Sequence, residues 1–136
     1  MTNSAFAPPI PVPDPDTAPF WEGLKDGKLM LCRCDDTGKW IHPPLERSRF
    51  TGGPVHFEQA SGEGTLFSYI VARQPLVPGR TPPYVIGIVE LAEQPGLRIN
   101  AIIAVDPAEV RIGQPVRMRV VDLGDTGFRV PEFILA

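Results

Sequence analysis

Cysteine and histidine are scarce in this chain, with two residues of each among 136. Cys32 and Cys34 stand two positions apart, a spacing at which a mutual disulfide is awkward. We therefore expect two reduced thiols, as in a cytoplasmic protein. The two histidines offer little for catalysis: His56 alternates toward solvent on a predicted strand, and His42 precedes Pro43 and is expected to pack locally.

The chain also lacks a run of basic residues, a membrane-length apolar stretch and a motif typical of an active site. Net charge is -3 and the pI is near 5.3, which argues against a nucleic-acid partner. The start of the chain has no basic region followed by an apolar run, so we expect no signal peptide. No Gly-x-Ser-x-Gly elbow occurs, and Gly62-Glu63-Gly64 lies between two predicted strands, so it is a turn and not a phosphate loop. These absences argue against an independent catalytic centre.

Proline, in contrast, is abundant, with 17 residues, which argues against a helical bundle and favours short strands. Residues 1–16 form an extended proline-rich arm in this interpretation. The arm is either a disordered tail or a segment that lies on a partner through Phe6, Ile10 and Val12.

Residues 17–27 are predicted to form a short helix, with Thr17 as its N-cap and Gly27 as its stop. Phe20, Trp21 and Leu24 share one apolar face at helical spacing. That face either covers the rest of the domain or contacts a partner subunit.

Residues 28–53 read as one strand followed by an irregular segment with two turns, and residues 54–136 as the main sheet. Val55–Ala60 is expected to begin that sheet, Gly87 to mark a bend or bulge, and Pro131 to weaken the final strand. A face shared by Phe67 and Tyr69 is either core or a stacking platform, and core is the better interpretation. The strand pattern predicts a mainly β protein, a five-stranded Greek-key barrel of the OB type.

Short motifs along most of the chain carry a family resemblance. They are Pro19-Phe20-Trp21-Glu22-Gly23-Leu24, Gly27-Lys28-Leu29, Arg33-Cys34, Pro43-Pro44, Gly62-Glu63-Gly64-Thr65-Leu66-Phe67-Ser68-Tyr69, Pro83-Tyr84-Val85-Ile86, Val89-Glu90-Leu91 and Val110-Arg111-Ile112-Gly113-Gln114-Pro115-Val116. In this order they resemble the acyl-CoA-associated OB-fold proteins that carry an N-terminal rubredoxin-like zinc ribbon. The resemblance implies an OB-fold barrel at 54–136, preceded by the short helix and a ribbon at 28–53.

The ribbon departs from the family pattern at its zinc ligands. Members of this family usually have two Cys-x-x-Cys pairs that close a tetrahedral zinc site. Here the four positions are Cys34, Thr37, Ser48 and Thr51, so only the vestigial Cys34 remains. We expect no zinc or other cofactor, and a ribbon held by Trp40, Ile41, Leu45 and Phe50 or by a partner. An alternative metal set would combine Cys32, Cys34 and His42 with Asp35 or Asp36.

The resemblance implies a non-catalytic accessory subunit. Such proteins accompany thiolase-fold enzymes (thiolase, acyltransferase or side-chain aldolase, some acting on steroid acyl-CoAs) or enoyl-CoA hydratases. The partner would then be a thiolase-like or hydratase subunit, with acyl-CoA as a candidate ligand and no membrane. A stand-alone acyl-CoA or lipid-thioester binding module is the alternative, and a single-stranded nucleic-acid binder is a weaker one.

Candidate binding residues lie in two places. Arg73, Arg80 and Tyr84 flank Pro75-Leu76-Val77-Pro78-Gly79 of the proline-rich loop 74–83, where arginines would meet CoA phosphates or an acidic protein surface. The alternative is a loop that is simply solvated. Phe20 and Trp21 on the short helix are candidates for partner contact.

Overall fold

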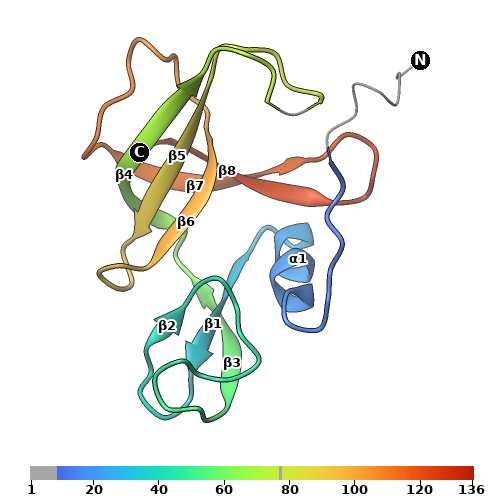
Figure 1. Cartoon of the computed structure of the whole chain (residues 1–136), viewed down its shortest axis with the longest axis vertical. Coiled ribbons are helices and arrows are strands. Elements are labelled where there is room, and N and C mark those ends of the chain that lie inside the picture. The colour runs from blue at the N-terminus through green and yellow to red at the C-terminus, as the bar shows by residue number, and fades with distance from the viewer. Residues whose placement is uncertain (1–8, 77) are drawn as a thin grey trace.

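The computed structural model describes residues 9–76 and 78–136, which form a small ribbon sheet, a barrel and one helix between them (Figure 1). The first eight residues of the expected arm and Val77 of the proline-rich loop lie outside the described residues. In chain order the elements are α1 (Ala18–Lys25), β1 (Leu29–Cys34), β2 (Trp40–Ile41), β3 (Val55–Ala60), β4 (Glu63–Ala72), β5 (Tyr84–Leu91), β6 (Arg98–Ile103), β7 (Pro115–Asp122) and β8 (Arg129–Leu135).

Five strands close into a barrel in the order β4-β5-β6-β8-β7. All neighbours are antiparallel except β6 and β8, which run parallel, and β4 pairs with β7 to close the circle. This is a five-stranded Greek-key barrel, so the predicted fold class is confirmed. After β6 the chain makes a single turn, in which Asp106 Oδ1 accepts from the Ala108 N–H at 2.9 Å.

The strand Val55–Ala60 belongs to the ribbon, and the expectation that it begins the main sheet is wrong. It pairs residue for residue with β1, from Leu29↔Ala60 to Cys34↔Val55, in a three-stranded sheet of order β2-β1-β3. Alternating polarity shows that a strand is half-buried but does not show which sheet receives it. The barrel therefore begins at β4.

The larger of two clusters of buried residues in the described part of the chain runs through the barrel and into the ribbon, and the smaller one, Cys32, Cys34 and Ile41, lies within the ribbon. The buried members of the larger cluster are Phe20, Leu24, Leu29, Leu31, Trp40, Ala60, Leu66, Val85, Val89, Leu91, Leu97, Ile99, Ile103, Val110, Val116 and Phe133. Phe20 and Leu24 come from α1, which covers one side of the barrel beside the β8 end (Figure 1). The apolar face predicted for the helix is thus used for packing.

The helix ends are set locally. Thr17 occupies the N-cap position, but its hydroxyl does not cap the helix, since it accepts from the Asp14 N–H at 3.1 Å while Asp14 Oδ1 accepts from the Thr17 N–H at 2.9 Å. Gly27 adopts φ +75°, a conformation that glycine reaches without steric cost, and it ends the helix as predicted.

An irregularity does occur in the central strands, but in β4 and not at Gly87. The register between β4 and β5 shifts between Leu66 and Ser68. Gly87 instead allows close packing, because a Cβ there would lie 2.5 Å from Ile103 Cγ1 and 2.8 Å from Leu66 Cδ1. The barrel interior at this level has no room for a larger residue.

Candidate functional site

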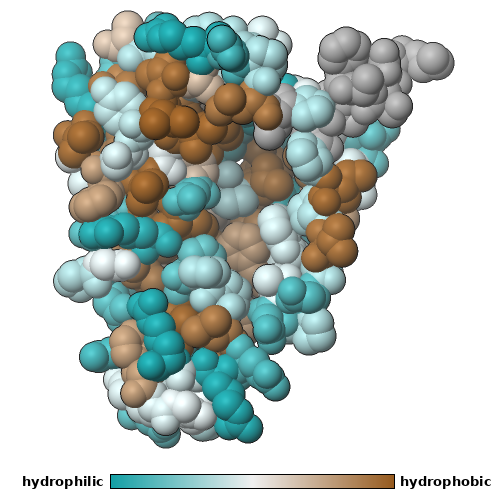
Figure 2. Space-filling view, viewed as in Figure 1, coloured by the Kyte–Doolittle hydropathy of each residue, from teal (hydrophilic) through white to brown (hydrophobic). Residues whose placement is uncertain are grey.

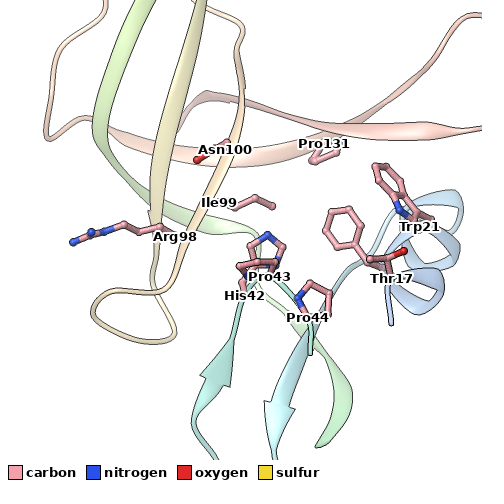
Figure 3. Close-up of a pocket in the computed structure, with 10 residues that line it drawn as sticks. Thr17, Trp21, His42, Pro43, Pro44, Arg98, Ile99, Asn100 and Pro131 are labelled. Atoms are coloured by element: carbon pink, nitrogen blue, oxygen red, sulfur yellow. The ribbon is translucent and has the colours of Figure 1, made fainter. Parts of the chain in front are cut away.

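A largely apolar cleft of about 450 Å³ lies where α1, the ribbon and the barrel meet (Figure 3). The lining residues come from all three parts: Thr17, Phe20, Trp21, His42, Pro43, Pro44, Arg98, Ile99, Asn100 and Pro131. A concave site of this size, with apolar walls and a few polar groups, is typical of ligand pockets and of anchor sites for a partner's side chains.

The helix wall consists of two aromatic residues with different degrees of burial. Phe20 is buried, whereas Trp21 is half-buried beside it, with ring centroids 5.0 Å apart in an edge-to-face arrangement. The Trp21 ring also lies 6.4 Å from Phe128, in the loop before β8. Successive helical residues point about 100° apart, so Phe20 faces the core while Trp21 lies at the edge of the cleft. Of the two predicted contact residues, Trp21 is therefore the more accessible one.

The ribbon wall is the segment His42-Pro43-Pro44. The His42 ring lies 5.9 Å from Phe20, and among the described residues its buried Nδ1 atom has no hydrogen-bond partner. Burial lowers the pKa of His42 below its ordinary value, so the ring is neutral at pH 7. The expected local packing of His42 is confirmed, and its ring adds one polar atom to the cleft wall.

The barrel wall is formed where β6 and β8 diverge. Their ladder spans Ile102↔Glu132 and Ile103↔Phe133, and the Ala104 N–H continues it to Phe133 O at 2.8 Å. Pro131 lies two residues before Phe133, so its nitrogen faces the same side, toward the cleft and away from β7. Its missing N–H thus costs the β7 ladder nothing, and β8 continues through this proline.

The proline-rich loop between β4 and β5, which carries Arg80, lies at the end of the barrel away from the ribbon (Figure 1). Arg80 is held within the fold: its Nη2 lies 3.2 Å from Glu132 Oε2, and its guanidinium stacks over the Tyr84 ring at 5.6 Å. Glu132 also binds Arg119, 3.1 Å from its other oxygen. Tyr84 is buried, and its hydroxyl has no partner among the described residues, while Arg73 is exposed at the end of β4. The structure thus pairs Arg80 with Tyr84 and leaves Arg73 open to solvent.

The outer face of β4, β5 and β6 is also apolar. Ile70 is 57 % exposed, and across the ladders it neighbours Ile86, which in turn neighbours Ile102. In Figure 2 apolar residues gather over the upper part of the barrel, whereas the ribbon end is mostly hydrophilic or neutral. A barrel face of this kind is a second candidate contact surface.

The pair Phe67 and Tyr69 does not share one face, so the core interpretation holds only for Tyr69. Phe67 is 43 % exposed, with the Arg98 guanidinium 3.7 Å from its ring centroid, whereas Tyr69 packs against the core. The β4 bulge between Leu66 and Ser68 shifts the alternation by one residue. That shift sends Phe67 outward.

The four family zinc positions meet in space at the tip of the ribbon. The Cys34 side chain is fully buried, with its sulfur 3.9 Å from Thr51 Oγ1, and hydrogen bonding to the hydroxyls of Ser48, Thr37 and Thr51 lowers the pKa of the thiol to about 7. Zinc in proteins is bound by thiolate, imidazole and carboxylate groups. One thiol and three hydroxyls do not fit that ligand set.

The alternative ligand set does not gather either. Cys32 points toward Leu45 O at 3.9 Å, while His42 packs on Phe20 in the cleft. In residues 9–76 and 78–136 no group of three or more histidine, cysteine, aspartate or glutamate side chains lies close enough to bind a metal ion.

His56, the second histidine, is a surface residue, 44 % exposed at its side chain. Its ring contacts Asp35 through Nδ1 and Glu58 through Nε2, and these two carboxylates raise its pKa above the ordinary value. No nucleophile is bonded to this ring among the described residues, so the arrangement is that of a surface ion-pair network, which Arg33 extends to Glu58 at 2.6 Å.

Several cleft residues escaped sequence reasoning. Arg98, Ile99, Asn100 and Pro131 lie on two strands far apart in the chain, and their role depends on the short β6–β8 ladder. The segment His42-Pro43-Pro44 carried a signal, since two prolines after a histidine in an irregular stretch indicate a rigid local wall. The sequence did not show which elements of the fold this segment would pack against.

Fold and site together define a class: an OB-type barrel with a helix and a ribbon poor in metal ligands, with a largely apolar cleft where the three parts meet. Two family models match the chain, "ChsH2, rubredoxin-like zinc ribbon domain" over residues 21–47 and "ChsH2, C-terminal OB-fold domain" over residues 57–121. The chain belongs to this family of ChsH2-type OB-fold proteins with a zinc-ribbon segment.

Solved structures show the same architecture. One described as "Ltp2-ChsH2(DUF35) aldolase" has a TM-score of 0.84 and 30 % identity, with 93 % of this chain and 98 % of that chain covered. A DUF35-family protein of unknown function from Sulfolobus solfataricus has a TM-score of 0.63 at 14 % identity, with 90 % of this chain and 86 % of that chain covered, and shares the fold alone.

Two curated relatives are hydratase subunits by name. The "3-oxo-4,17-pregnadiene-20-carboxyl-CoA hydratase alpha subunit" of Mycobacterium tuberculosis is 43 % identical over 112 residues, 81 % of this chain and 35 % of the relative. The "Probable enoyl-CoA hydratase alpha subunit" of Thermomonospora curvata is 34 % identical over 109 residues, 79 % of this chain and 34 % of the relative. This chain therefore spans about a third of the length of these relatives. Separately, none of the helices in the described residues is both long and apolar enough to cross a membrane.

Proposed function

We propose that this protein is a non-catalytic accessory subunit of an enzyme complex that acts on acyl-CoA thioesters. The partner is a thiolase-fold enzyme (thiolase, acyltransferase or side-chain aldolase) or an enoyl-CoA hydratase. The observation that carries the proposal is the match over 98 % of the chain described as "Ltp2-ChsH2(DUF35) aldolase". The two hydratase alpha subunits among the relatives support the same assignment.

The distribution of side chains supports a binding role. Apolar groups remain accessible on the Trp21 side of the cleft and on the outer barrel face around Ile70. The two histidines lie on separate surfaces, and neither contacts a serine, cysteine or threonine in the described residues that would act as a nucleophile. The chemistry then belongs to the partner chain.

We further propose that the subunit works in the cytoplasm and needs no cofactor. Its two cysteines are free and buried, which suits a reducing compartment.

The test is the native mass of untagged protein purified from its own host. We expect a mass well above that of the 14.9 kDa monomer, with a thiolase-fold or hydratase polypeptide present in a fixed ratio. The partner's turnover of an acyl-CoA substrate should fall when this chain is removed and return when it is added back. A lone monomer, or a partner whose activity ignores this chain, contradicts the proposal.

A stand-alone acyl-CoA binding module is the second candidate, favoured by the apolar cleft. In that case the isolated chain would bind an acyl-CoA tightly in calorimetry without a second polypeptide. Tight binding of single-stranded nucleic acid with a steep salt dependence would instead favour the third hypothesis, a single-stranded nucleic-acid binder.

A further inference from the structure

We propose that a hydrogen-bonded cluster of Cys34, Thr37, Ser48, Thr51 and Asp36 closes the ribbon in the place where related ribbons hold zinc. The inference is independent of the proposed partner. It concerns how a ribbon of this family keeps its shape after losing three of four ligands.

The four family positions retain the geometry of two facing pairs. Cys34 and Thr37 are three residues apart at the end of β1, and Ser48 and Thr51 have the same spacing in the opposite loop. Such spacing is usual for zinc ligand pairs. Cys34 Sγ lies 3.9 Å from Thr51 Oγ1 across the two loops, and the hydroxyls of Ser48 and Thr37 lower the pKa of the same thiol.

Thr51 joins the two loops on its other side. Its hydroxyl donates to Asp36 Oδ2 at 2.8 Å and accepts from the Gly53 N–H at 3.1 Å. One hydroxyl therefore contacts the thiol, a carboxylate of the first loop and the backbone of the second.

Ser48 is the buried centre of the second loop. Its Oγ accepts from the Phe50 N–H at 3.1 Å and from the Thr51 N–H at 3.3 Å. Its backbone carbonyl accepts from the Gly52 N–H at 2.8 Å, and its own N–H donates to Gly53 O at 2.9 Å. A buried hydroxyl with these partners satisfies the loop's backbone groups without a metal.

Apolar packing alone does not hold these loops. Trp40 and Ile41 are buried as expected, but Leu45 and Phe50 are largely exposed. The expectation that all four residues hold the ribbon is thus correct only for Trp40 and Ile41, which form β2. At the tip of the ribbon, the polar cluster spans both loops, together with the Asp35 N–H, which donates to Pro54 O at 3.1 Å, and Lys39 Nζ, which lies 4.9 Å from the Phe50 ring centroid.

The experiment compares the wild-type chain with the triple variant Thr37→Cys, Ser48→Cys and Thr51→Cys, both produced with added zinc. We expect the triple variant to bind about one zinc ion per chain, to give tetrahedral-thiolate absorption with cobalt, and to lose thermal stability in a chelator. Wild type should hold less than about a tenth of an ion, with a melting temperature that a chelator leaves unchanged. The matched control carries the same three substitutions plus Cys34→Ser, and its zinc affinity should drop at least about tenfold.

Two single variants test the cluster in the wild-type background. Ser48→Ala should lower the melting temperature because it leaves the partly buried N–H groups of Phe50 and Thr51 unpaired. Thr51→Val should lower it because it removes the hydrogen bonds of this hydroxyl to Asp36 and to the Gly53 N–H. About one tightly bound zinc in wild type, a folded triple variant without zinc, or unchanged melting temperatures for both single variants would each overturn the inference.

Discussion

The two histidines show how different surroundings shift the pKa of the same residue type in opposite directions. His56 lies between two carboxylates on the ribbon surface, while His42 is packed on Phe20 in the cleft. Carboxylates favour the charged ring and burial disfavours it.

An NMR titration of the two imidazoles should therefore give pKa values on either side of 6.5, with His56 above and His42 below. Folding takes up a proton at His56, so its share of stability is full below pH 6.5 and is lost as the pH rises through the folded pKa. For His42 the sign is reversed, and stability falls as the pH drops below 6.5. Asp35→Asn should move only the His56 value downward; two values near 6.5 would contradict the assignment.

Glu132 is a second residue whose role is set by its partners. It is nearly buried in β8 and binds Arg80 and Arg119, which are themselves partly exposed. Solvent around the arginines weakens each pair, so we expect Glu132→Gln to lower the free energy of unfolding by about 1–2 kcal/mol. Glu22→Gln, which breaks the exposed Lys25 pair, should change it by less than about 0.5 kcal/mol in the same denaturant titration. Equal effects would show that burial of Glu132 is irrelevant.

At the scale of elements, β4 and β5 illustrate how a small irregularity redirects side chains. The β4 bulge turns Phe67 outward, and Gly87 of β5 lets Ile103 and Leu66 meet inside the barrel. Both features lie in one pair of neighbouring strands.

Gly87→Ala should destabilise the barrel by about 1–3 kcal/mol, since the added methyl overpacks the core. The measurement is the denaturation midpoint, with Ile70→Ala on the exposed outer face as the control, expected within about 0.5 kcal/mol. A neutral Gly87→Ala would mean that the interior relaxes at no cost.

At the scale of the whole molecule, the cleft exists only because α1 and the ribbon meet the barrel where β6 and β8 diverge. The two aromatic residues of α1 that line the cleft differ in burial, since Phe20 packs in the core and Trp21 lies at the edge of the cleft.

Under the proposed function, Trp21→Ala should abolish partner copurification at a small cost in stability, about 1 kcal/mol. Phe20→Ala should instead lower the free energy of unfolding by about 3–5 kcal/mol, as for other buried phenylalanines. Native mass and melting temperature are measured on both variants, with Leu76→Ser, exposed on the distant loop, as the control. Retention of the partner by folded Trp21→Ala would place the contact elsewhere, with the outer barrel face the next candidate.

The sequence by itself determined the local elements and the class of barrel. Alternating strands, the apolar face of Phe20 and Leu24, and the stop at Gly27 depend on neighbours in the chain, so they were readable from it. The same holds for the substituted zinc positions, because their three-residue spacing is a property of the chain.

Only the tertiary structure decided which sheet receives β3, where the bulge falls and which walls meet at the cleft. Each depends on contacts between residues far apart in sequence, such as Leu29 with Ala60 or His42 with Phe20. The periodicity of a segment shows which of its faces is buried, but it does not show which other element that face packs against. A hydrogen-bonded cluster such as that around Cys34 requires two loops to lie within a few ångströms of one another.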